Sequence, residues 1–455
     1  MGLLLQYFLL KCLLFLILPP FSAQHVSPMQ RPCLDFEPSA LLQLEESFVL
    51  NRSASAFSKD DSWKLEEWIE GDCCSWDGVE CVGNTGHVIG LDLSSSFLYG
   101  YIDSNSSLFQ LHHLTRLNLS DNDFYGSEIP SAIGNLSMLS QLDLSNSVFS
   151  ELRNPNLKSL AERLVNLEHL DLDGVIASSV VPRSLATDVA STNSYGDILP
   201  SLINLTSLAD LRLLQNQFSS QIPSWFGNLT RLTNLELGDN NFWGLVPESI
   251  FTLTKLYSLH LVNNHLSSSS KLGSFLNLKS LKGLQLSGNK FSFVTTPVMN
   301  ATAYPQMDMG LICSNSSSFN FKRKLLYRVP PTSCCVPPWT NLRFLDLSSN
   351  KLRGSLPVPP ASIYYYRVSN NLLTGEISSI ICNLPSISVL DISNNGFSGT
   401  LPPCLGTLSK SLTVLNLQNN FRCPIPQACE KGSQVKEIDL SQNQLKGHIP
   451  RSLVN

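Results

Sequence analysis

A leucine pattern that recurs at a nearly constant interval limits the possible folds of this chain more than any other feature. The pattern Leu-x-x-Leu-x-x-Leu-x-Leu-x-x-Asn occurs, for example, at 111–122, 229–240 and 253–264. The last apolar residue of each Leu-x-Leu segment falls at thirteen positions: 93, 119, 144, 172, 213, 237, 261, 286, 347, 368, 392, 417 and 440. Ten of the steps between them are 21 to 28 residues, and the other two are 41 and 61. This period predicts one stack of repeated units rather than a series of separate domains.

Each unit has a simple physical interpretation. Leu-x-Leu suits a short strand that turns two side chains inward, and stacking on neighbouring units buries them. Ten of the thirteen units carry an Asn three residues after the strand, where its amide can satisfy buried backbone groups; Ser96, Ser147 and Val175 fill the other three. Units then continue as Asn-x-Phe/Leu-x-Gly-x-Ile-Pro, as at 350–357 and 443–450. The recurring Pro and Gly exclude a coiled coil.

This unit is identified as a leucine-rich repeat, and it resembles the plant-specific extracellular class. The resemblance implies an α/β-type leucine-rich-repeat solenoid, a curved right-handed superhelix. Short parallel strands would line its concave face, and 3-10 or polyproline-like segments its convex face. We expect a disulfide-bonded helical cap at the N-terminal end.

The predicted cap spans 24–86. Residues 40–48 have the apolar spacing of an amphipathic helix, and the segment Asp-Cys-Cys-Ser-Trp-Asp-Gly-Val-Glu-Cys follows at 72–81. A solenoid needs a cover over its open apolar end. Adjacent cysteines rarely bond to each other, so we predict the pairs Cys33–Cys73 and Cys74–Cys81. We predict no metal and no cofactor, because the cluster lacks Cys-x-x-Cys spacing and a neighbouring His.

The N-terminus predicts entry into the secretory pathway. Residues 3–18 are apolar apart from Gln6 and Lys11, so 1–23 is expected to be a signal peptide, with an uncleaved anchor as the alternative. Loss of Cys12 from the twelve cysteines would leave an odd number and at least one unpaired. The pairing of Cys313, Cys334, Cys335, Cys382, Cys404, Cys423 and Cys429 stays open. Eight sequons are candidates for N-glycosylation: Asn51, Asn105, Asn118, Asn135, Asn204, Asn228, Asn300 and Asn315.

The cap, followed by Gly-His-Val-Ile-Gly-Leu-Asp-Leu-Ser at 86–94, resembles the plant receptor-like proteins, cell-surface leucine-rich-repeat receptors without a kinase. The resemblance implies ligand recognition on the extracellular side of the plasma membrane, in defence or development, with receptor kinases as co-receptors. The family pattern continues with further repeats, a C-terminal cap and a membrane span. We find no membrane-span pattern here and expect a C-terminally truncated chain, anchored only if a longer form supplies the span.

The repeats are expected at 87–293, with an irregularity at 175–204, and again at 339–455 without a C-terminal cap. Between them, 294–338 fits no unit. It could be a ligand loop, an insert closed by Cys313, Cys334 and Cys335, or degenerate or scrambled sequence, and we favour the last interpretation.

The expected concave face carries the candidate site. Residues flanking the inward leucines form a polar ladder suited to a peptide or protein ligand. We select Arg212, Glu236, His260 and Gln285, whose strands are regularly spaced and differ in chemistry. A glycan on Asn118 would mask the N-terminal end of this face.

Other function classes are disfavoured. Thirty-one Lys and Arg against 36 Asp and Glu leave a net charge of −5 and no basic stripe for nucleic acid. Without His-Glu-x-x-His, Gly-x-Ser-x-Gly or a phosphate-binding Gly loop, we predict no catalytic residues and no enzyme. Two alternatives stay open: a soluble apoplastic inhibitor similar to polygalacturonase-inhibiting proteins, and a non-functional remnant or decoy.

Overall fold

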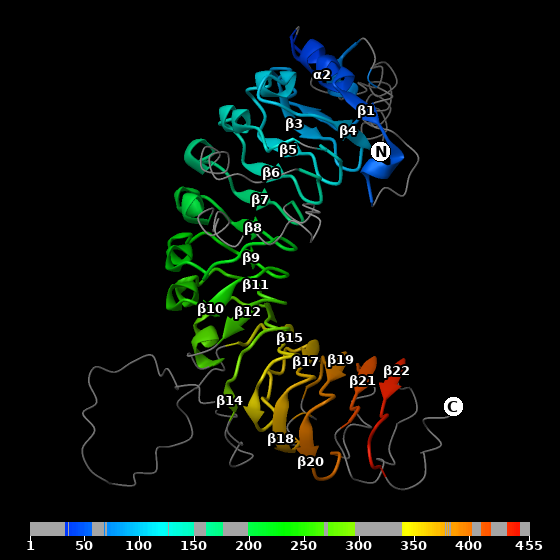
Figure 1. Cartoon of the computed structure of the whole chain (residues 1–455), viewed down its shortest axis with the longest axis vertical. Helices are drawn as coiled ribbons and strands as arrows, with labels where there is room; N and C mark the ends of the chain where they lie inside the picture. Colours follow the sequence, from blue (N-terminus) through cyan, green and yellow to red (C-terminus); the bar gives the residue numbers. More distant parts are fainter. Residues whose placement is uncertain are drawn as a thin grey trace, which may run out of the picture.

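A computed structural model of the chain forms a long, curved solenoid (Figure 1). It describes residues 32–34, 36–56, 68, 71–125, 127–149, 161–175, 199–267, 272–295, 339–377, 379, 381, 384–402, 411–419 and 435–445. The predicted signal peptide, the sequons at Asn300 and Asn315, and most of 175–204 and 294–338 lie outside these residues. So do the seven cysteines from Cys313 to Cys429 whose pairing was left open.

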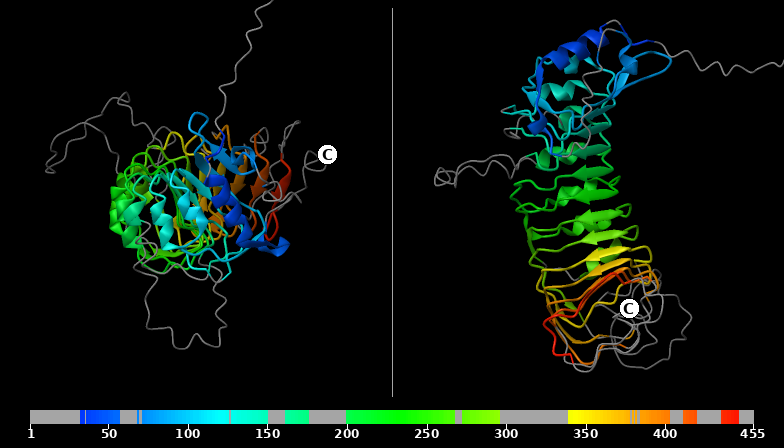
Figure 2. Two further views of the ribbon diagram at one scale, coloured as in Figure 1. Left: turned by 90° about the horizontal axis from the view of Figure 1, so that it is seen from above. Right: turned by 90° about the vertical axis from the view of Figure 1, so that its right-hand side faces the viewer.

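One parallel sheet runs along the described chain, with its strands stacked on one face (Figure 2). Its thirteen parallel strands match the thirteen units counted in the sequence, and β2 (Val79–Cys81) of the cap adds to its end in antiparallel orientation. The parallel strands are β3 (Val88–Asp92), β5 (Arg116–Asn118), β6 (Gln141–Asp143), β7 (His169–Asp171), β8 (Asp210–Arg212), β9 (Asn234–Glu236), β11 (Ser258–His260), β13 (Gly283–Gln285), β15 (Phe344–Asp346), β17 (Tyr365–Arg367), β19 (Val389–Asp391), β21 (Val414–Asn416) and β22 (Glu437–Asp439).

The sheet is continuous across both irregular intervals of the sequence. Strand β7 pairs directly with β8, with Leu170 opposite Leu211. Strand β13 pairs directly with β15, with Leu284 opposite Leu345. No further strand can therefore lie between the members of either pair, and the concave face keeps its register over the long connections.

Leucines at alternate positions hold the units together. The middle residue of a strand points into the core, as Leu235 and Leu259 do with no exposed surface, while its two neighbours stay partly accessible. Burial of one such side chain stabilises the fold by about 1.5–3 kcal/mol. The core is a single cluster from Ala40 in the cap to Leu417 near the other end.

An asparagine ladder closes the core beside the strands, as predicted. Asn240 donates from Nδ2 to the carbonyls of Leu213 and Gly238 at 2.7 and 2.9 Å, and its Oδ1 accepts from the backbone N–H of Phe218. The residue before each ladder position has a positive φ. It is a glycine only at Gly174 and Gly288, and elsewhere the local turn holds a side-chain residue in the left-handed region.

The opposite side carries 3-10 helices and small sheets (Figure 2). The 3-10 helices of the repeats are η4 (Ser107–Gln110), η5 (Ser131–Asn135), η8 (Leu199–Asn204), η9 (Ser224–Asn228), η10 (Glu248–Thr252) and η11 (Leu272–Asn277). The flanking strands are β4 (Leu98–Gly100), β10 (Trp243–Leu245), β12 (His265–Ser267), β14 (Val294–Thr295), β16 (Arg353–Gly354), β18 (Leu372–Glu376) and β20 (Gly396–Ser398). The predicted division into concave strands and convex 3-10 segments is confirmed.

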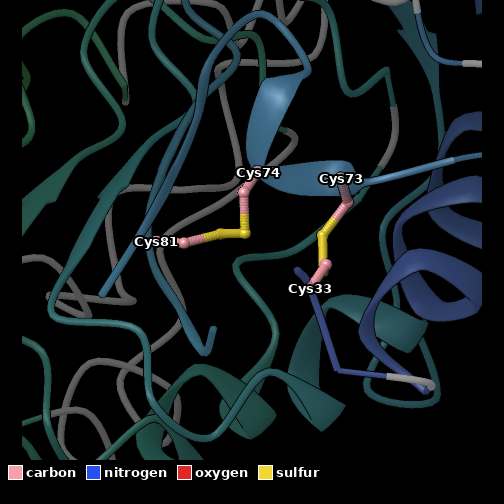
Figure 3. Close-up of side chains that lie close together, drawn as sticks. All are labelled: Cys33, Cys73, Cys74 and Cys81. Atoms are coloured by element: carbon pink, nitrogen blue, oxygen red, sulfur yellow. A yellow bond between two sulfur atoms is a disulfide. The ribbon is translucent and has the colours of Figure 1, made fainter. Parts of the chain in front are cut away.

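The cap covers the first repeats. Helix α2 (Glu37–Glu46) buries Leu41 and Leu44, β1 (Phe48–Leu50) pairs with β4, and the short helices η1 (Arg52–Ala54) and η3 (Cys73–Ser75) complete the cap. Disulfides join Cys33 to Cys73 and Cys74 to Cys81, each with Cα atoms 5.5 Å apart, so both predicted pairings are confirmed (Figure 3). None of the described helices has the length and apolar character to cross a membrane.

Candidate functional site

Two rows of side chains run across the strands on the concave face. We call them the first-position and third-position rows, after the place of each residue in its three-residue strand or, in β3, in the last three residues of the strand. The third-position row, read through the strand register, is Asp92, Asn118, Asp143, Asp171, Arg212, Glu236, His260, Gln285, Asp346, Arg367, Asp391, Asn416 and Asp439. The first-position row is Gly90, Arg116, Gln141, His169, Asp210, Asn234, Ser258, Gly283, Phe344, Tyr365, Val389, Val414 and Glu437.

Most of the third-position row has a structural role. Its eight Asp and Asn residues each accept a hydrogen bond through Oδ1 from the backbone N–H two residues later, as Asp346 does from Ser348 at 2.9 Å. These side chains form the turn that leaves each strand. Five positions depart from this role: Arg212, Glu236, His260, Gln285 and Arg367.

Four of those five are the predicted ligand-binding residues, and the register places them on consecutive strands. His260 Nδ1 lies 3.9 Å from Glu236 Oε2, and burial lowers the pKa of this imidazole. Arg212 is the most exposed of the first three, with 41% of its side chain accessible. The four predicted residues therefore form one continuous row on the concave face, while their role in ligand binding remains a proposal.

A groove lies on the N-terminal side of this row. It has a volume of about 710 Å³ and is floored by the middle residues of β3 to β7. The polar residues that line it are Glu80, Asp92, Arg116, Asn118, Gln141, Asp143, His169, Asp171, Asp210 and Arg212. Gly90 lets the cap strand β2 approach β3 closely, since a Cβ there would lie 3.2 Å from Glu80 Cβ.

Both arginines of the groove are already paired with carboxylates. Arg212 donates from Nε and Nη2 to the two oxygens of Asp210 at 3.2 and 3.3 Å. Arg116 donates to Glu80 of the cap strand β2. The neighbouring Asp171 is less closely paired, with its Oδ2 3.9 Å from Arg212 Nη1.

Burial and like charges perturb the acids beside the groove. Burial, followed by repulsion from Asp173, raises the pKa of Asp171 to about 7. Burial also raises the pKa of Asp173 to about 6, against a hydrogen bond from the Leu214 N–H. These two carboxyls therefore gain much of their negative charge between pH 5 and 8.

The concave face has a different character further along the solenoid. Phe344 and Tyr365 stack in the first-position row with ring centroids 4.0 Å apart and planes 4° from parallel. Both are half-buried, and Val389 and Val414 continue the stripe on the next two strands. Arg367 donates from Nε to Asp391 at 2.9 Å in the adjacent row.

Part of this arrangement is not predicted from the sequence. Gln141 and Asp143 of strand β6 lie outside the four predicted binding residues, although they follow the same Leu-x-Leu pattern. The place of Glu80 depends on the antiparallel addition of β2, for which the repeat offers no sequence signal. The aliphatic stripe could have been found by reading one row across the units.

The described sequons differ in accessibility. Asn105, Asn135, Asn204 and Asn228 are exposed, and the last three end the 3-10 helices η5, η8 and η9. Asn118 is only partly exposed and lines the groove. The N-terminal masking expected of a glycan there would thus fall on the groove itself.

Comparisons with known proteins agree with this architecture. The Leucine Rich Repeat family model matches residues 113–136, 341–363, 386–408 and 434–455. Receptor-like protein 54 of Arabidopsis thaliana is 30% identical over 428 residues, which cover 83% of this chain and 53% of the relative. The chain is a leucine-rich-repeat protein related to the plant receptor-like proteins.

Other relatives of this leucine-rich-repeat protein match shorter segments. Receptor-like protein 7 of Arabidopsis thaliana is 45% identical over 144 residues, 31% of this chain and 14% of the relative. Receptor-like protein Cf-9 of Solanum pimpinellifolium is 32% identical over 253 residues, 47% of this chain and 29% of the relative. The matches thus span about half the length of these relatives, or less.

Solved structures show the same fold. The crystal structure of a TDR receptor superposes with a TM-score of 0.60 at 24% identity, covering 81% of this chain and 54% of that one. The plant peptide hormone receptor RGFR1 in complex with RGF2 gives 0.54 at 24% identity, covering 84% and 58%.

Proposed function

We propose that this chain is the ligand-recognition region of a plant cell-surface receptor-like protein. It acts on the extracellular side of the plasma membrane, binds a peptide or protein on its concave face, and signals in defence or development through partner receptor kinases. It is a binding protein and not an enzyme.

One observation carries the proposal: the break in the third-position row. In most units the third-position residue is Asp or Asn, and it accepts the hydrogen bond that forms the turn of the repeat. Four adjacent units between β8 and β13 instead carry Arg, Glu, His and Gln. Side chains that do not form the turn hydrogen bond, gathered on adjacent strands of a concave surface, are best explained by a ligand. The receptor-like relatives, and the peptide in complex with one neighbour of this fold, support the same class of function.

The proposal is tested by expressing the tagged full chain in leaf tissue and isolating it under mild detergent. We expect it in the glycosylated, cell-surface or apoplastic fraction, together with receptor kinases identified by mass spectrometry. A cap variant with Cys33→Ser and Cys73→Ser controls for capture of misfolded protein.

The competing inhibitor function predicts a different result. Purified chain would then inhibit a fungal polygalacturonase at stoichiometric concentration and would associate with no receptor kinase. That combination would overturn the receptor proposal, whereas kinase association without inhibition would exclude the inhibitor.

A further inference from the structure

The groove carries an excess of negative charge that its own arginines do not balance. Its lining includes five carboxylates, Glu80, Asp92, Asp143, Asp171 and Asp210, against two guanidinium groups. Fully ionised, these seven side chains sum to −3. Arg116 is engaged by Glu80, and Arg212 is engaged mainly by Asp210, with Asp171 at 3.9 Å, so the excess lies around Asp92, Asp143 and Asp171. A cationic group is the complementary ligand.

A second feature on the same face calls for an apolar group. The stacked rings of Phe344 and Tyr365 are only half-buried, and burying them further would be favourable. Val389 extends the stripe on the next strand. An apolar or aromatic side chain placed here would remove this surface from water.

The surface between these two features is low and polar. From Asp210 the first-position row continues through Asn234, Ser258 and Gly283 before it reaches Phe344. Ser258 and Gly283 are small, so an extended backbone can approach the sheet closely and hydrogen-bond to Asn234. Strands β7 and β15 are five steps apart in the sheet. At about 4.8 Å per step this is roughly 24 Å, which an extended chain covers in about seven residues.

We propose that the ligand is an extended peptide lying across the strands, with a Lys or Arg in the groove beside Asp143 and Asp171. An apolar or aromatic residue about seven positions away packs on Phe344 and Tyr365. This inference rests on the proposed function and specifies its ligand.

The proposal also predicts how binding depends on pH. The neighbours that face Asp171 are Asp143, Asp173 and Arg212 on the strands and turn around it, with His169 and Asp210 beside them. As pH rises from 5.5 to 7.5, Asp171 and Asp173 gain negative charge. Affinity for a cationic peptide therefore increases over this range.

The test uses labelled synthetic peptides on a Gly-Ser background and the full secreted chain, with fluorescence anisotropy at pH 7.5 and physiological salt. One peptide carries Lys and Phe seven positions apart, and a second carries them in the reverse order. Control peptides shorten the spacing to three or replace Lys by Glu. We expect the peptide with one of the two orders to bind about tenfold tighter than either control peptide at pH 7.5. The same peptide should bind about threefold more weakly at pH 5.5 than at pH 7.5.

Variants of the protein separate the two contacts. Asp143→Asn with Asp171→Asn should weaken binding of the Lys-Phe peptide about tenfold, and Phe344→Ala about fivefold. The fold should tolerate the Asn changes, since Asn118 and Asn416 accept the same turn hydrogen bond in the native row. Asp439→Asn is the matched control, an identical change at the far end of the row, and should leave binding unchanged.

Several results would overturn the inference. The first is equal affinity for peptides of both spacings, and the second is an equal loss of affinity in the Asp439→Asn control. The third is no binding of any peptide at 1 mM, the dissociation constant that corresponds to a binding free energy of only about −4 kcal/mol. The receptor proposal is judged separately by kinase association in leaf tissue. A chain that recruits kinases but ignores these peptides would refute only the ligand specified here.

Discussion

The two ends of the concave face share one backbone and differ in surface chemistry. Between β5 and β9 the exposed rows hold arginines, carboxylates and a histidine, whereas between β15 and β21 the first-position row is aromatic and aliphatic. The apolar core, the ladder positions and the left-handed turn residue recur in both regions, with Ser147 and Val175 in place of Asn in the first and Tyr366 in place of a core Leu in the second. The solenoid thus keeps its buried core apart from the first-position row, so that the residues of this row can vary while the core stays the same.

The largest expected effect tests the shared part of this comparison. Leu235→Ala in β9 and Leu390→Ala in β19 each remove a side chain with no exposed surface. Both should lower the free energy of unfolding by about 2–5 kcal/mol and by similar amounts, because the core is equivalent in the two regions. Urea denaturation followed by circular dichroism measures this. A loss of stability in only one of the two variants would show that the two cores differ.

The asparagine ladder offers a smaller, matched pair of changes. Asn240→Ala and Asn371→Ala each remove an amide that donates to the preceding unit, at 2.7 and 2.9 Å, and accepts from a backbone N–H. The carbonyls left without a donor are buried, so we expect losses of about 2–3 kcal/mol in both variants. Calorimetry provides the comparison. Ser441→Ala, at an exposed turn outside the ladder, should change little.

Removal of one carboxylate charge should change the free energy of unfolding in opposite directions in the two regions. Asp171 has its pKa raised to about 7, above the value of about 3.9 for an unfolded chain. Between pH 4 and 7 the folded state therefore binds more protons, and the free energy of unfolding falls as pH rises through this window. Asp171→Asn lacks this loss and should be more stable than the native chain at pH 7.5, by on the order of 2 kcal/mol, and equally stable below pH 4.

Asp391 occupies the same row in the other region but bonds to Arg367. Asp391→Asn should therefore destabilise the protein at pH 7.5, by about 1 kcal/mol. Urea titrations of both variants at several pH values test the contrast. Two changes of the same sign would show that the local charge environments do not differ as described.

Glycosylation gives the smallest effect on stability but a direct test of the groove. The exposed Asn105, Asn135, Asn204 and Asn228 should carry glycans, whereas the partly buried Asn118 should not. Deglycosylation in heavy-oxygen water followed by peptide mass spectrometry reads occupancy at each site. A fully occupied Asn118 would place a glycan inside the groove and remove it as a binding surface.

The sequence predicted the scaffold well because every unit repeats the same physical demand. The thirteen strands, the asparagine ladder and both cap disulfides could be placed from spacing and local chemistry. Two features of the structure could not be predicted from the sequence. The left-handed turn residue is Asp, Asn, Ser or Gln in eleven units, so glycine does not mark it. The groove depends on Glu80, which a strand of opposite direction brings beside Arg116, and on the pairing of β7 with β8 across a 41-residue step.

The direct pairing across unequal connections also bears on how such a protein can change over generations. Because neighbouring units meet through the same Leu-x-Leu strand and, in most units, the same Asn, units are interchangeable at their seams. Exchange of a whole unit between related genes would replace one residue in each row and leave every other row position in place. Recognition can then be altered one strand at a time, by recombination as well as by point mutation, without a new fold having to be found at each step.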